Sequence, residues 1–111
     1  MRDPLAGADI LTEAHNLITG ARQNAYGHPK DDYAKVLRIF QSLTGIRLAY
    51  SDAIFFMVSV KLARLVTNLE AGKFHRDSIV DAAGYLGVMA MIDAALQAPA
   101  AEDRSTPQTP A

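Results

Sequence analysis

Charged side chains interrupt two otherwise apolar stretches in the second half of the chain. Lys61 and Arg64 follow eight uncharged residues, and Asp77 and Asp81 open a second apolar stretch. At spacings of three and four, the members of each pair share one face of a helix. A buried charge must be paired or bound to a ligand. These positions therefore predict either an ion pair or an anion site.

Two interpretations of these residues stay open. In the structural one, Arg64 and Asp81 form a buried ion pair that fixes the register of two helices, while Lys61 extends to solvent. In the functional one, the guanidinium and ammonium groups bind an anion, most naturally a phosphate. Asp77 and Asp81 then face the same pocket, and Tyr85 lies one turn further along.

A second cluster of polar residues is expected at a connector between helices. Tyr26 would offer an aromatic face for a base, and Arg22 would offer a charge for a phosphate. The helix that begins at Pro29 would add free N–H groups, which favour an anion. The alternative is a capping turn with a packed Tyr. The predicted ligand-binding residues are Arg22, Tyr26, Gly27, His28, Lys61, Arg64, Asp77, Asp81 and Tyr85.

The spacing of the apolar residues predicts the helices that must position these side chains. Apolar residues from Ile10 to Ala21 form one stripe at a period of 3.6, preceded by Asp9 as a cap. Further helices are predicted over 29–45, over 51–71 with Ser51 as N-cap, and over 77–97. The expected fold is an all-α, antiparallel four-helix bundle that forms a single domain over residues 8–97.

The amino-acid composition argues against several classes of function. The chain has 111 residues, a net charge of −1 and no Cys. A near-neutral charge argues against DNA as a partner, and the lack of Cys excludes disulfides and thiolate metal sites. Uncharged stretches fall short of the roughly 18 apolar residues that span a membrane, so no membrane partner and a cytoplasmic location are expected. Residues 98–111 hold three of the five prolines and are predicted to be disordered.

Helices 51–71 and 77–97 are apolar on nearly every side, which predicts a homo-oligomer built through them. Gly84 and Gly87 lower helix propensity, and they predict close approach of another helix or a ligand. A magnesium site needs several converging carboxylates. No E-x-x-E, H-E-x-x-H, P-loop or G-x-G-x-x-G occurs, so no cofactor or metal is predicted.

Three motifs together resemble a family of small phage and prophage proteins of unassigned function. They are R-x-x-x-Y-G-x-P at 22–29, K-L-A-R at 61–64 and D-S-I-V-D-A-A-G-Y at 77–85. The family usually has Asn-Phe where this chain has Asp32 and Tyr33, and Leu-Trp at Ile39 and Phe40.

More distantly, the last two helices resemble MazG-like nucleotide pyrophosphohydrolases. In those enzymes an E-x-x-E helix and an E-x-x-D helix hold magnesium over phosphates. The resemblance implies that Asp81 matches the final Asp and that Asp77 lies near the preceding acid, while Lys61 and Arg64 fill the E-x-x-E positions. Two cations in place of two carboxylates would hold phosphates directly but would not activate water.

The leading expectation is a phage-type protein that binds a nucleotide or another phosphate-bearing ligand with little or no hydrolysis. The phage resemblance implies a use in the cytoplasm of an infected host, where it would sequester a nucleotide signal of anti-phage defence. One alternative is a magnesium-dependent pyrophosphohydrolase with Asp77 and Asp81 as catalytic residues. It would need further carboxylates, such as Asp31, Asp32 or Glu70. Another alternative is a helical interaction module without a small ligand.

Overall fold

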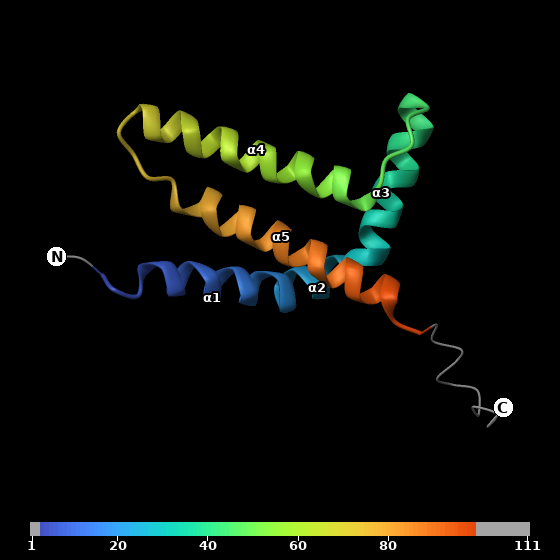
Figure 1. The fold of residues 1–111 in the computed structure, drawn as a ribbon, viewed down its shortest axis with the longest axis horizontal. Helices are drawn as coiled ribbons and strands as arrows, with labels where there is room; N and C mark the ends of the chain where they lie inside the picture. The colour runs from blue at the N-terminus through green and yellow to red at the C-terminus, as the bar shows by residue number, and fades with distance from the viewer. Residues whose placement is uncertain (1–2, 100–111) are drawn as a thin grey trace, which may run out of the picture.

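The structure is a computed structural model that describes residues 3–99, with the side chains of residues 21 and 22 outside that description. It contains α1 (Ala6–Thr19), α2 (Ala21–Tyr26), α3 (Pro29–Thr44), α4 (Tyr50–Glu70) and α5 (Arg76–Gln97) (Figure 1). Over these residues no strand occurs, and the all-α prediction is confirmed. In the predicted disordered tail, residues 100–111 lie outside the described residues.

The helix boundaries follow local capping chemistry. At the start of α3, the Nδ1 atom of His28 accepts a hydrogen bond from the Lys30 N–H at 3.0 Å, and α3 ends at Gly45, whose φ of 75° is left-handed. For α4 the prediction of Ser51 as N-cap was wrong. The helix begins after Ala49, because the Asp52 carboxylate accepts the Ala49 N–H at 2.9 Å.

The first predicted helix ends earlier than its apolar stripe suggests. The helix is interrupted at Gly20, and the short helix α2 occupies part of the expected connector. Glycine disfavours a continuing helix because its backbone loses the most conformational freedom on folding. The connector is therefore a helical turn that ends at Gly27.

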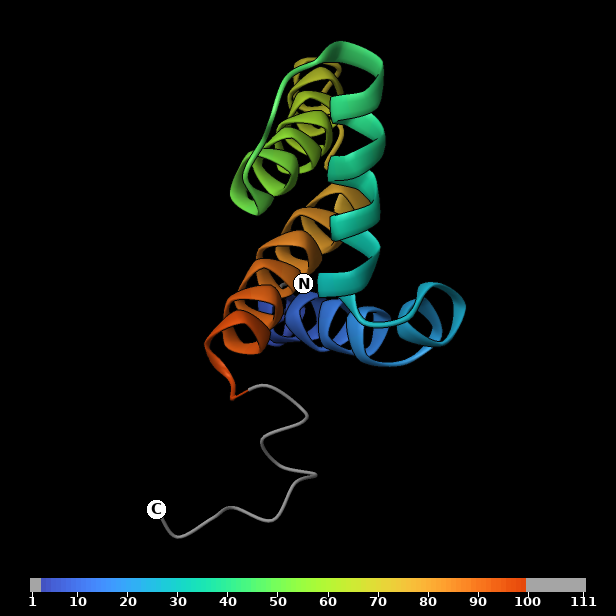
Figure 2. The same ribbon diagram turned by 90° about the vertical axis from the view of Figure 1, so that its right-hand side faces the viewer.

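The prediction of an antiparallel bundle holds only for α4 and α5, which form a hairpin (Figure 1). Along α5, α1 runs parallel, since Glu13 pairs with Arg76 near the start of α5 and Ile18 packs on Gly84 and Gly87 further along. The helix α3 stands across the end of the hairpin (Figure 2). Because α2 and α3 carry the chain over that end, α1 and α5 point the same way.

The core lies where α3, α4 and α5 meet. Ile54 and Ile92 are 0% and 2% exposed, and Tyr33 and Val88 pack beside them. Between α1 and α5 the contact depends on Gly87. A Cβ atom there would lie 2.9 Å from the Cδ1 atom of Ile18. The predicted close approach of another helix at this glycine is confirmed.

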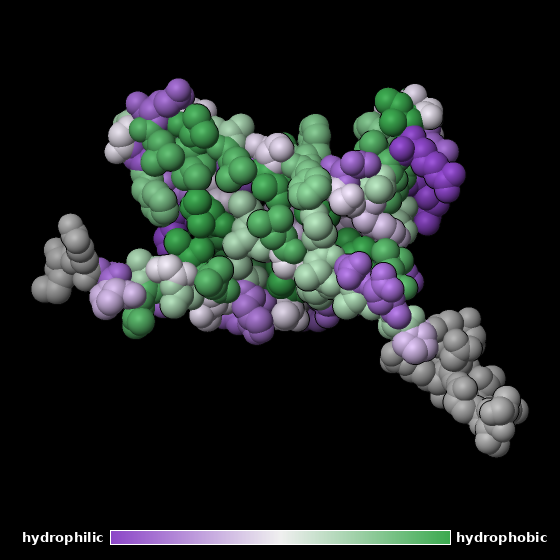
Figure 3. Space-filling model, in the orientation of Figure 1, coloured by the Kyte–Doolittle hydropathy of each residue, from purple (hydrophilic) through white to green (hydrophobic). Residues whose placement is uncertain are grey.

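A large share of the apolar surface stays outside this core. Figure 3 shows apolar side chains spread over the face formed by α4 and α5. By length and composition, α5 is also the one helix of the described chain that could cross a membrane, a test that a helix packed among others can pass as well.

Candidate functional site

The centre of the candidate site is an ion pair between α4 and α5. The Lys61 Nζ atom lies 2.9 Å from the Asp81 Oδ2 atom, and their side chains are 17% and 32% exposed. The structural interpretation, in which Arg64 pairs with Asp81 and Lys61 extends to solvent, was therefore wrong about which cation forms the ion pair. Three residues are short of a full helical turn, so Arg64 is rotated by about 60° from Lys61. Arg64 is exposed.

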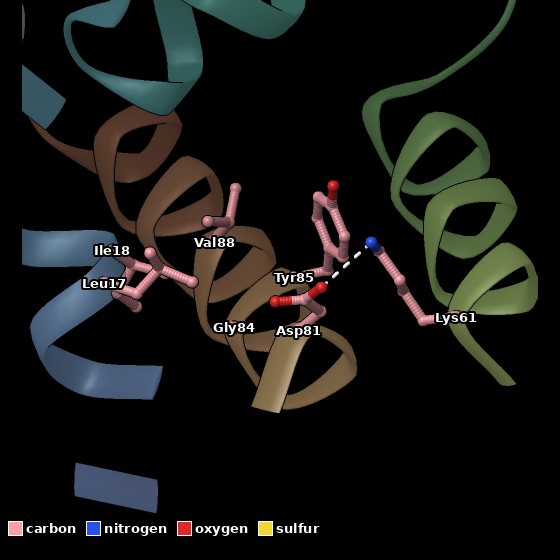
Figure 4. A pocket seen from close by; sticks show the side chains of 7 residues that line it. All are labelled: Leu17, Ile18, Lys61, Asp81, Gly84, Tyr85 and Val88. Carbon is pink, nitrogen blue, oxygen red and sulfur yellow. Dashed lines mark ion pairs between the residues drawn. The ribbon is translucent and has the colours of Figure 1, made fainter. Parts of the chain in front are cut away.

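A pocket of about 100 Å³ opens beside this pair. Figure 4 shows Lys61 extending from α4 towards α5, with the Tyr85 ring beside its amine. The opposite wall comes from Leu17 and Ile18 of α1. Gly84, which is buried, keeps the backbone of α5 free of a side chain where it lines the pocket. The pocket thus combines one cation, one carboxylate, one aromatic ring and an apolar wall.

A second and much smaller crevice, of about 10 Å³, lies on the other side of Ile18 and Val88. These two residues line both cavities. The walls of the crevice include Tyr26 and Gly27 of the predicted connector cluster, and Asp32 of α3. The two clusters that the sequence singled out therefore lie on opposite sides of one apolar partition.

Of the other predicted residues, His28, Arg64 and Asp77 line neither of these two cavities. The Nδ1 atom of His28 is engaged in capping α3, and Asp77 is exposed in the first turn of α5. Arg22 belongs to α2, but its side chain lies outside the described residues. Across the described part of the chain, no three His, Cys, Asp or Glu residues gather in a way that could hold a metal ion.

Sequence reasoning missed the apolar half of the site. Leu17, Ile18 and Val88 read as ordinary members of helical stripes, and nothing in their types marks a pocket wall. Gly84 carried a signal, since a glycine inside a helix predicts a close approach. Asp32 was named in the phage motif and as a possible further carboxylate of the hydrolase alternative, and the structure puts it in the smaller crevice.

The chain is similar to one protein family and to two phage proteins. Residues 9–93 match the model of a domain of unknown function, DUF6378. The chain is 34% identical over 83 residues to the Gene 55 protein of Mycobacterium phage D29, an alignment that covers 75% of this chain and 52% of that protein. It is 32% identical over 81 residues to the Gene 55 protein of Mycobacterium phage L5, with 72% and 49% covered. This chain spans about half the length of these relatives. No solved structure matches it.

Proposed function

Because this chain belongs to the DUF6378 family, which includes phage proteins and has no assigned function, we propose its function from the site: it binds a phosphate-bearing small molecule, most naturally a nucleotide. The observation that carries the proposal is the Lys61–Asp81 pair at the pocket between α1, α4 and α5. A pocket with an apolar wall and few convergent polar groups is typical of small-molecule sites.

The chemistry of the pair supports a ligand with both phosphate and hydroxyl groups. An ammonium group has three N–H donors, and Asp81 takes one of those on Lys61. The remaining donors would bind phosphate oxygens, while free lone pairs of the Asp81 carboxylate would accept hydroxyl groups of a sugar. A nucleotide carries both kinds of group on adjacent atoms.

A site for an anion needs a further positive charge, because the Asp81 carboxylate neutralises the Lys61 ammonium group. Arg64 lies three residues after Lys61 and is exposed, and within the described chain no ion pair engages it. Its guanidinium would bind a phosphate in bidentate fashion. Arg64 would therefore supply the charge that attracts the ligand, and Lys61 would position its phosphate.

The size of the pocket sets how a ligand would lie. Sites that enclose a drug-sized ligand measure about 300–1,000 Å³, so about 100 Å³ would take one phosphate or the edge of a sugar. The rest of the ligand would extend along the surface. Tyr26, which is 62% exposed beyond the Ile18 and Val88 partition, offers an aromatic face on which a base could stack.

The pyrophosphohydrolase alternative, and with it a MazG-like relation, has less support. Asp77 and Asp81 share the start of α5, but the former is exposed and the latter pairs with Lys61. A magnesium site on helices needs more converging carboxylates than this chain brings together in its described part. Carboxylates from a neighbouring subunit would have to complete it.

Non-hydrolytic binding would suit sequestration. A phage protein that holds a nucleotide without cleaving it would lower the concentration of a nucleotide signal of bacterial defence. The phage origin of the relatives and the proposed phosphate contacts of Lys61 and Arg64 support this role.

A thermal-shift screen of the purified chain tests the proposal. ATP, ADP-ribose, cyclic di-AMP and a cyclic trinucleotide are added with and without magnesium, and each ligand that raises Tm is recovered for mass analysis. We expect a magnesium-independent shift with unchanged ligand mass. A shift only with magnesium and a cleaved ligand would support the hydrolase, whereas no shift across the panel would favour the interaction module.

A further inference from the structure

We propose that a second copy of this chain packs antiparallel against the outer face of α4 and makes the protein a homodimer. That face carries five large apolar side chains that are 44–69% exposed. They are Phe55, Phe56, Leu62, Val66 and Leu69, and together they form the outer α4 stripe. None of these five residues lines the pocket, so this inference stands apart from the proposed ligand site.

The stripe has the spacing of a helix–helix seam. Phe55, Leu62 and Leu69 are seven residues apart, and Ser59 and Val66 lie between them at the same interval. A repeat of this kind is what packs one helix against another along its length. On the inner side of α4, Ala53 and Ile54 are buried, so the stripe is a second apolar face that the described chain leaves uncovered. Contiguous apolar surface of this kind marks an interaction site.

A two-fold axis between Leu62 and Ala63 would bring apolar residues of the two copies together. Residues 56 and 69 are equally far from the point between Leu62 and Ala63, and so are Ser59 and Val66. A two-fold axis through that point would place Phe56 against Leu69 of the partner subunit. A face that matches itself under a two-fold rotation is what a homodimer interface requires.

The charges at the two ends of the stripe select the antiparallel orientation. Asp52 lies in the first turn of α4, and Lys73 lies just beyond its last turn; both are exposed. These positions are also equally far along the sequence from the point between Leu62 and Ala63. An antiparallel pair therefore places each Asp52 opposite Lys73 of the partner subunit. A parallel pair would place like charges opposite each other, which is unfavourable.

Sedimentation equilibrium of the full chain tests the dimer. We expect a mass of twice 12.0 kDa, and a rise of about 100-fold or more in the dimer Kd for Leu62→Glu, because the charge would be buried in an apolar seam. Leu43→Glu is the matched control. It places the same charge on an 80% exposed leucine of α3 and should leave the Kd unchanged. Circular dichroism verifies that each variant is folded.

Disulfide trapping tests the register and uses only small substitutions. The chain has no cysteine of its own, so every cross-link comes from an introduced pair. The double variant S59C/V66C should form a covalent dimer on mild oxidation, while each single variant should not. In one helix these positions are about 10 Å apart, too far for an internal bridge.

The outcomes separate clearly. A dimer that Leu62→Glu dissociates, with cross-linking confined to the double variant, supports the proposal. A monomeric wild type, a dimer that survives Leu62→Glu or one that Leu43→Glu dissociates would overturn it. Cross-linking of S59C alone would mean parallel helices and would overturn the antiparallel register. Lys73→Glu gives a further check, since it should raise the dimer Kd by about tenfold.

Discussion

The Lys61 Nζ atom on α4 lies 2.9 Å from the Asp81 Oδ2 atom on α5, in a partly exposed pair at the edge of a pocket. This contact joins the two arms of the hairpin and leaves both groups with unused hydrogen-bonding capacity. It can therefore contribute to stability and to ligand binding at once, and the two contributions are separable by mutation.

The contribution of the pair to stability is measured by a double-mutant cycle. Lys61→Met and Asp81→Asn, alone and together, are compared by urea unfolding. We expect a coupling energy of at least about 0.5 kcal/mol, as for other residues in contact. Strictly additive effects would show that the pair contributes nothing to the fold.

Arg64→Ala separates binding from folding. Because Arg64 is exposed, its truncation should change the free energy of unfolding by no more than about 0.5 kcal/mol. The affinity for a nucleotide should fall, since the charge that attracts the anion is lost. A loss of about 3–5 kcal/mol in unfolding experiments would instead mean a buried ion pair at this position.

The two glycines of α5 should respond differently to substitution. At Gly84 an added Cβ atom would lie 3.4 Å from Ile18, whereas at Gly87 it would lie 2.9 Å away. Gly84→Ala should be neutral or stabilising by up to about 1 kcal/mol, because alanine favours a helix. Gly87→Ala should be less favourable than Gly84→Ala, because its Cβ atom would have to displace the Cδ1 atom of Ile18. Equal effects on thermal unfolding would contradict this difference.

A buried hydroxyl anchors the start of α5. The Ser78 Oγ atom lies 2.5 Å from the Nδ1 atom of His75, and Ser78 is 1% exposed. Ser78→Ala removes this hydrogen bond and should lower the free energy of unfolding by about 0.5–1.5 kcal/mol. Ser51→Ala is the control, since Ser51 does not cap α4. Chemical denaturation that gave the same small loss for both variants would refute a special role for Ser78.

The sequence predicted most of the secondary structure, because the determinants are local. Gly45 ends α3 as expected, and the period of apolar residues located all four long helices. The direction of α1 along α5 could not be predicted. It depends on how α3 crosses the hairpin, which periodicity does not encode.

The site was predictable in its polar half only. Lys61, Asp81 and Tyr85 were expected together, and they line one pocket. Which cation pairs with Asp81 depends on the rotation of α4 about its axis, and the pocket wall depends on the parallel packing of α1. Both are tertiary features, so Ile18 gave no signal in the sequence.

An NMR titration of ¹⁵N-labelled protein tests the central claim most directly. ATP, ADP-ribose and cyclic di-AMP are added separately to the wild type and to Lys61→Met. We predict that at least one of them shifts the amide signals of Leu17, Gly84 and Tyr85 in the wild type, and that Lys61→Met abolishes these shifts while its spectrum stays folded. Shifts confined to other surfaces, or unchanged shifts in the variant, would contradict a phosphate site at the Lys61–Asp81 pocket.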